Sequence, residues 1–183
     1  MANPEELEFL QDSADDWNIH RREHQIMHPD LSGANLSAAE LPYADLSGAD
    51  LTRADLRAID LTGSNLANAD LTEANLSGAD LLNADLTGAN LTRADLTGAD
   101  LTEANATNAI LTNATLTGAV LAGTNLTNVD LTNAILFKVD LSGANLTNAT
   151  LLQSDLTEAN LANANLANTD LTGVIGLNLN NAE

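Results

Sequence analysis

The sequence predicts an all-β solenoid in which a short strand and a corner repeat along the chain. Leucine occupies every fifth position from Leu31 to Leu171, and only Ala106 interrupts this series of 29 positions. Two positions before the leucine, alanine occurs in 21 repeats. Asp or Asn precedes the leucine in 23 repeats, and Ser or Thr follows it in 20. A five-residue period fits neither a helix of about 3.6 residues per turn nor a flat strand, so the chain must turn within each repeat.

Each column of the repeat has a physical explanation. The leucine and the alanine two residues before it point the same way from an extended segment, so they form the core, and the Asp or Asn between them points outward. Two positions after the leucine, Gly occurs in 10 repeats and Asn in 9, and these residues tolerate the positive φ of a type II turn. Pro42 precedes this column, at the turn position that favours proline.

Four corners close a square, which predicts a coil of 20 residues and about seven coils along the rod. Residues 20 apart would then stack about 4.8 Å from each other. In this register Arg53, Glu73 and Arg93 form a column of alternating charge, and Lys138 lies against Glu158. Two asparagine ladders are also predicted, one at Asn105, Asn125, Asn145 and Asn165 and one at Asn108, Asn128, Asn148 and Asn168.

The segment ANLTRADLTGADLTEAN, residues 89–105, follows the pattern A-(D/N)-L-(S/T)-x without interruption. In this pattern the chain resembles the pentapeptide-repeat proteins, and its short helical start resembles cyanobacterial members of that family. The resemblance covers roughly residues 26 to 175 and implies a right-handed quadrilateral β-helix. We therefore expect a helical cap at residues 1–25, the β-helix at 26–175 and a C-terminal tail at 176–183.

The N-terminal cap is predicted to contain one or two short helices between residues 4 and 24. Asn3 is placed to cap a helix that begins at Pro4, and Ser13 is placed to start a second one before two acidic residues. An apolar helix face is formed by Leu7, Leu10, Ala14 and Trp17. We expect Trp17 to close the end of the first coil, where an open solenoid would otherwise expose its edge.

The C-terminal end has a different pattern. The repeat frame breaks at Gly176, next to Ile175, Leu177 and Leu179. These apolar residues either fold over the last coil or contact another subunit. In the branch of the family linked to quinolone resistance, dimers form through C-terminal ends, so the resemblance implies a homodimer as one alternative.

Composition excludes several classes of function. The chain has 26 acidic and 6 basic residues, a net charge of −20, which argues against direct binding of nucleic acid. There is no cysteine, no apolar run of membrane-spanning length and an acidic N-terminus, so we expect a soluble cytoplasmic protein that does not enter a membrane.

No catalytic, metal or cofactor site is predicted. His20, His24 and His28 are four residues apart, a spacing that can hold a metal on a helix, but we interpret them as exposed residues of the cap. The aspartate columns lack the loop geometry of a calcium site. A convex rod with a solid Leu and Ala core offers no cleft for a substrate, so we do not expect an enzyme.

Two functional hypotheses remain. In the first, the chain is a binding or scaffolding rod for an unidentified protein, and its contact surface is the set of outward apolar residues in the less charged half: Ile110, Val120, Ile135, Phe137 and Leu152. In the second, the acidic rod mimics DNA and modulates DNA gyrase or topoisomerase, as the resemblance to gyrase-directed relatives implies. The acids assigned to that role form two columns: Asp60, Asp80 and Asp100 on one face, and Asp50 and Asp70 on another.

Overall fold

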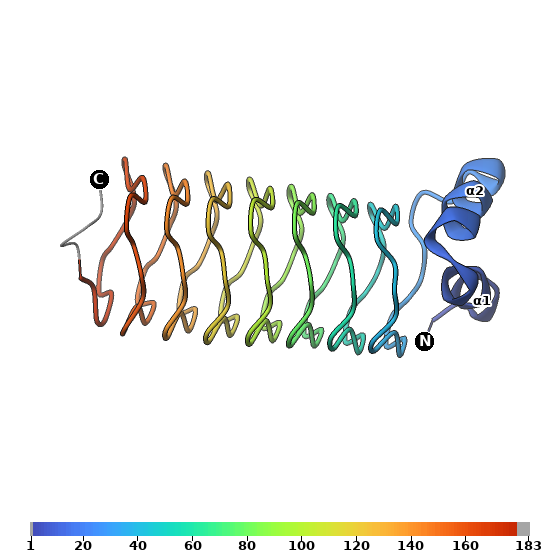
Figure 1. Ribbon diagram of the computed structural model, residues 1–183, viewed down its shortest axis with the longest axis horizontal. Helices are drawn as coiled ribbons and strands as arrows, with labels where there is room; N and C mark the ends of the chain where they lie inside the picture. Colours follow the sequence, from blue (N-terminus) through green and yellow to red (C-terminus); the bar gives the residue numbers. More distant parts are fainter. Residues whose placement is uncertain (1, 179–183) are drawn as a thin grey trace.

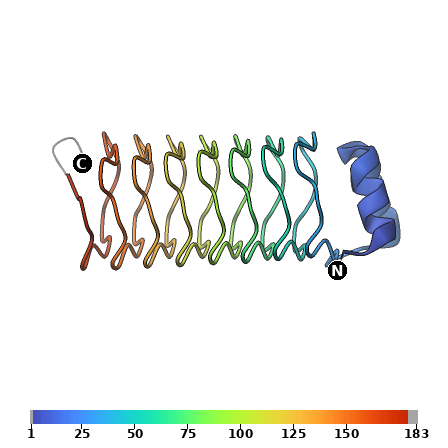
Figure 2. The same ribbon diagram turned by 90° about the horizontal axis from the view of Figure 1, so that it is seen from below.

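The protein is a straight rod with two helices packed against one end (Figure 1). The computed structural model describes residues 2–178. Helix α1 spans Pro4–Asp12 and helix α2 spans Ala14–His24. A view from below shows both helices at one end of the rod, with the last described coil, drawn in red, at the far end (Figure 2).

Parallel β-bridges between residues 20 apart hold the rod together. They begin with Asp30 and Asp50 and continue without a gap to Asp155 and Ile175. The bridged positions are five residues apart, so four columns run along the rod, and the predicted 20-residue register is confirmed. We name these columns sides I, II, III and IV, in which every twentieth residue is counted from Asp30, Asn35, Glu40 and Asp45 respectively. Sides I and III face opposite directions, as do sides II and IV.

Each corner is a turn with a left-handed residue. The Ala34 amide donates to the Leu31 carbonyl at 3.0 Å, and Gly33 between them has a φ of 65°. These are features of a type II turn, as predicted. The same column has a positive φ when the residue is neither Gly nor Asn, with 56° at Arg53 and 52° at Ala58. The solenoid therefore imposes this conformation, even though it strains a residue with a Cβ.

The Asp and Asn column has a structural role that the sequence analysis missed. The Oδ1 atom of Asp70, for example, accepts hydrogen bonds from the Thr72 amide at 3.0 Å and the Thr72 hydroxyl at 2.6 Å. The same arrangement lowers the pKa of Asp155, first through the Thr157 hydroxyl and then through its amide. These side chains thus cap the corner that follows them, besides lying on the surface.

The core is a stack of leucine and alanine side chains. The leucines of the five-residue series from Leu31 to Leu161 are at most 3% exposed, and Ala106 in the same series is 2% exposed. At the C-terminal end of the described rod, Leu166, Leu171 and Val174 are only partly buried. The core is therefore closed at the helical end and more open at the other.

Stacking of residues 20 apart confirms the predicted charge columns. Glu73 pairs with Arg53 at 2.8 Å and with Arg93 at 3.5 Å, and Lys138 pairs with Glu158 at 3.5 Å. All five side chains are at least 36% exposed, so solvent screens these pairs and they contribute little to the stability of the fold.

Both asparagine columns stack at 20-residue spacing as predicted, but only one of them forms a ladder of hydrogen bonds between asparagine side chains. Asn128 donates to Asn108 at 3.0 Å, and Asn148 and Asn168 continue this series at 3.2 and 3.3 Å. In the second column the Asn145 amide instead donates to the Thr127 hydroxyl at 3.0 Å. The reason is that Oδ1 of Asn125 already accepts from the amide and hydroxyl of Thr127, so the hydroxyl oxygen is the acceptor that the next coil meets.

The helix starts are as predicted. The Asn3 side chain accepts from the Glu5 amide at 3.1 Å, and the Ser13 hydroxyl accepts from the Asp16 amide at 3.0 Å. Helix α2 ends at His24, followed by Gln25 in the left-handed region with a φ of 52°. The first bridged residue is Asp30, so the expected boundary at residues 25 and 26 falls in the connection between α2 and the rod.

Candidate interaction surfaces

Side chains of the cap take the place of a preceding coil. On side IV, the Trp17 indole donates to the Asp45 carbonyl at 2.8 Å, and the Asn18 side chain accepts from the Asp45 amide at 2.7 Å. On side I, the Asp30 amide donates to the Glu6 carboxylate at 2.8 Å. Elsewhere in the rod, backbone groups of the previous coil make these bonds. Trp17 is fully buried, which confirms its predicted position over the first coil.

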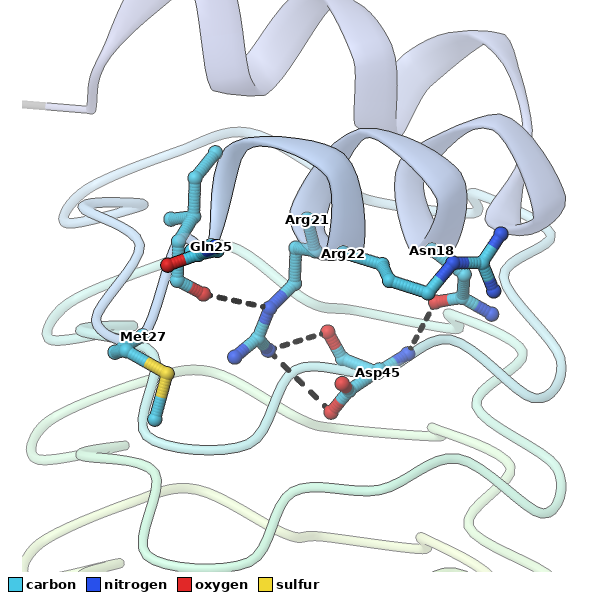
Figure 3. Close-up of a pocket in the computed structure, with 7 residues that line it drawn as sticks. Asn18, Arg21, Arg22, Gln25, Met27 and Asp45 are labelled. Atoms are coloured by element: carbon cyan, nitrogen blue, oxygen red, sulfur yellow. Dashed lines mark hydrogen bonds and ion pairs between the residues drawn. The ribbon is translucent and has the colours of Figure 1, made fainter.

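Arg21 is a further cap side chain that makes hydrogen bonds in place of a preceding coil. Its guanidinium donates to the carbonyls of Ile26 at 3.1 Å and Asp45 at 2.6 Å (Figure 3). It also donates to the Ser47 carbonyl at 2.9 Å. Burial lowers the pKa of Arg21 from its ordinary value, and the carboxylates of Asp45 and Glu6 oppose that shift. A hollow of about 620 Å³ lies beside Arg21, but the arginine is bonded to the rod and holds the cap in place.

The prediction that the cap histidines are exposed is wrong for His20, which is only 5% exposed. Helix α1 packs on α2, and the Phe9 ring stacks on the His20 ring with centroids 3.8 Å apart. The His24 ring is also near, with its centroid 4.3 Å from that of His20. Within residues 2–178, no group of three or more His, Cys, Asp or Glu side chains is arranged to hold a metal ion.

The two acidic columns lie on opposite sides of the rod. Bridges stack Asp60, Asp80 and Asp100 on side III, and they stack Asp50 on Asp70 on side I. A partner that approaches from one direction would therefore meet only one of these columns.

The outward apolar residues are spread over three sides. Ile110 lies on side I, Val120 on side III and Ile135 on side II. Ile110 and Ile135 are 42% and 44% exposed. Phe137 and Leu152 are partly exposed and occupy the two corners that border side II. We name Ile135, Phe137 and Leu152 the side II patch, because they lie on side II and at its two corners. Val120 lies across the Phe137 corner on side III, and Ile110 lies on side I.

The residues proposed for a C-terminal contact are only partly described. Ile175 ends side II and is 60% exposed, whereas Leu177 is partly buried against the core. Leu179 lies outside the described residues.

Comparison with known families matches the chain to pentapeptide repeats over residues 30–68, 64–102, 99–136 and 140–175. The chain belongs to the pentapeptide repeat family. Members of this family fold as right-handed quadrilateral β-helices, which agrees with the fold predicted from the sequence. Comparison with curated protein sequences finds no match. The described part of the chain contains no helix of the length and apolar character needed to cross a membrane.

Several solved pentapeptide repeat proteins are similar to the chain. A protein of the Arabidopsis thaliana thylakoid lumen is 32% identical over 59% of this chain and 71% of its own, with a TM-score of 0.41. HetL, involved in heterocyst differentiation regulation in the cyanobacterium Nostoc sp. strain PCC 7120, is 27% identical over 86% and 95%, with a TM-score of 0.26. QnrB1, a plasmid-mediated fluoroquinolone resistance protein, is 24% identical over 79% and 78%, with a TM-score of 0.42. The predicted resemblance to cyanobacterial members of the family is confirmed.

Proposed function

We propose that this pentapeptide repeat protein is a non-catalytic rod of about seven coils that binds a protein partner through outward residues of its C-terminal half. The observation that supports this most strongly is the exposed isoleucine at position 135, where the repeat usually has Asp or Asn. An Asp or Asn at this position would accept hydrogen bonds from the following corner, and isoleucine cannot do so. The isoleucine side chain is still 44% exposed, so it loses a capping bond without reaching the core. A contact with another molecule gives this residue a role that the fold does not.

The test is affinity capture with matched variants. Immobilised wild-type protein should retain a partner that a variant with Ile135→Asn and Phe137→Thr releases, because both replacements are residues that the repeat uses at these positions and they remove the apolar side chains. Thermal unfolding of the variant shows whether it is folded. Identical sets of captured proteins for the folded variant and the wild type would contradict the proposal.

A second candidate function is modulation of DNA gyrase or topoisomerase by an acidic surface. It is favoured by side III, where Glu40, Asp60, Asp80, Asp100 and Asp140 occupy five of seven positions. Between Asp30 and Asp170 the chain has 18 acidic and 4 basic residues, net −14. At about 4.8 Å per coil, the rod is about 36 Å long and has one net charge per about 2.6 Å, against about 1.7 Å in duplex DNA.

A gyrase supercoiling assay tests this second candidate. The variant Asp60→Asn, Asp80→Asn and Asp100→Asn keeps the side-chain oxygen that caps each corner and removes only the charge. Inhibition at micromolar protein that this variant loses would support DNA mimicry. Absence of inhibition by the wild type would exclude it for gyrase.

We also propose a homodimer formed through the C-terminal end, with Ile175, Leu177 and Leu179 at the contact. The support is the 60% exposure of Ile175 at the end of side II. Sedimentation equilibrium should show a dimer that Ile175→Asn weakens. A monomeric mass across the micromolar range would count against this contact.

A further inference from the structure

The side II patch is formed by two successive coils. Ile135 projects from side II, and Phe137 follows it at the next corner. Leu152 comes from the next coil, where its carbonyl accepts from the Asn133 amide at 2.9 Å. Three apolar side chains therefore lie within about one coil spacing, about 4.8 Å along the axis.

Two carboxylates lie on the C-terminal side of this patch. Asp155 is bridged to Ile135 in the same column, and Glu158 lies at the corner beyond it. The Thr157 hydroxyl and amide hold the pKa of Asp155 below its ordinary value, so this group is charged at neutral pH. Lys138 is 5.0 Å from the centre of the Phe137 ring and 3.5 Å from Glu158. Asp155 and Glu158 against Lys138 give the rim a net charge of −1.

Ile110 shows that an exposed isoleucine alone does not make such a surface. It has nearly the same exposure as Ile135, at 42% against 44%. Its neighbours on side I are Asn90 and Asp130, and the next corner begins with Thr112. Ile110 is therefore a single apolar residue among polar ones, whereas Ile135 has apolar residues at both adjoining corners.

We propose that the side II patch binds a basic amphipathic helix of the partner protein, with apolar residues against Ile135, Phe137 and Leu152 and Lys or Arg against Asp155 and Glu158. This inference rests on the proposed function and specifies the partner's chemistry. The helical pitch of about 5.4 Å is close to the coil spacing of about 4.8 Å, so apolar residues one turn apart can meet side chains of successive coils. Opposite charges at the rim would orient the helix and exclude acidic segments.

The test uses synthetic peptides of defined pattern, because the natural partner is unidentified. The first is a fluorescein-labelled helical peptide with leucine on one face and lysine on the other. The second has glutamate in place of lysine, and the third has alanine in place of leucine. Fluorescence anisotropy with the full-length protein at physiological salt measures binding. We expect the leucine–lysine peptide to bind about tenfold or more tightly than either of the others.

Matched protein variants locate the site. Ile135→Asn with Phe137→Thr should weaken the leucine–lysine peptide to the level of the alanine–lysine peptide, whereas Ile110→Asn should leave binding unchanged. Equal binding by wild type and the side II variant, or equal loss in both variants, would overturn the assignment to side II. Equal binding of the lysine and glutamate peptides would overturn the basic helix. If affinity capture still yields a partner that depends on Ile135, only the helix chemistry is wrong and the proposed function stands.

Discussion

Replacing Ala106 by leucine should stabilise the rod, because the coil has the same backbone geometry there as at its leucine positions. The Ala106 amide donates to the Asn125 carbonyl of the next coil at 2.8 Å. The corresponding hydrogen bonds from the Leu86 and Leu126 amides in the same column are 2.7 and 2.8 Å long. The corner after Ala106 closes at 3.0 Å, like its neighbours. The backbone has therefore not contracted around the smaller side chain, and the position is 2% exposed.

The expected gain follows from the three carbon atoms that leucine adds. Burying each one is worth about 0.8 kcal/mol, so the substitution should add about 2.4 kcal/mol to the free energy of unfolding. The reverse change in other protein cores costs about 2–5 kcal/mol, which is consistent with this value. For a chain of 183 residues the unfolding temperature should rise by about 5–10 °C.

Urea denaturation followed by far-ultraviolet circular dichroism measures this change, with Leu116→Ala as the control that should cost about 2–5 kcal/mol. An unchanged or lowered midpoint for Ala106→Leu, with the control behaving as expected, would refute the reasoning. It would mean that leucines of neighbouring coils already fill the space beside Ala106.

Three further predictions concern the cap, the corners and pH. Arg21→Met should lower the free energy of unfolding by about 2–4 kcal/mol, whereas the same change at exposed Arg22 should be neutral. The reason is that the carbonyls of Ile26 and Ser47 lose the Arg21 donor, and the Asp45 carbonyl keeps only the Trp17 indole. Ala58→Gly should stabilise by about 1 kcal/mol by relieving a left-handed conformation, and Gly78→Ala should cost a similar amount. Folding lowers the pKa of Asp155, so its contribution to stability is present above the ordinary pKa of 3.8 and disappears as the pH falls through the lowered value. Urea midpoints measured from pH 7 to pH 2 should decline in that range, and a flat profile would contradict the hydrogen-bond explanation.

The architecture could be predicted because each position of the repeat has one structural role. The leucine period determines the corners and the 20-residue register, and this register alone places Glu73 between Arg53 and Arg93. The helix starts at Asn3 and Ser13 were equally predictable, since capping depends on residues within three positions.

The remaining features depend on contacts that the repeat does not encode. Burial of His20 follows from the packing of α1 on α2, which brings Phe9 onto its ring. The acceptor role of the Asp and Asn column was missed although its signal was present, because Ser or Thr two residues later is the spacing of a local side-chain cap. The side II patch depends on the position of Phe137 and Leu152 at the two corners of side II, in successive coils.

The 20-residue register makes the direction of the side II patch depend on the number of repeats between it and the cap. Insertion of one five-residue repeat near the middle of the rod would rotate every later residue by a quarter turn about the axis. Insertion of four repeats would preserve the orientation and move the patch along the axis by about 4.8 Å. A partner that touches both the cap and the patch should therefore bind much less well after an insertion of 5, 10 or 15 residues. An insertion of 20 residues should weaken its binding far less.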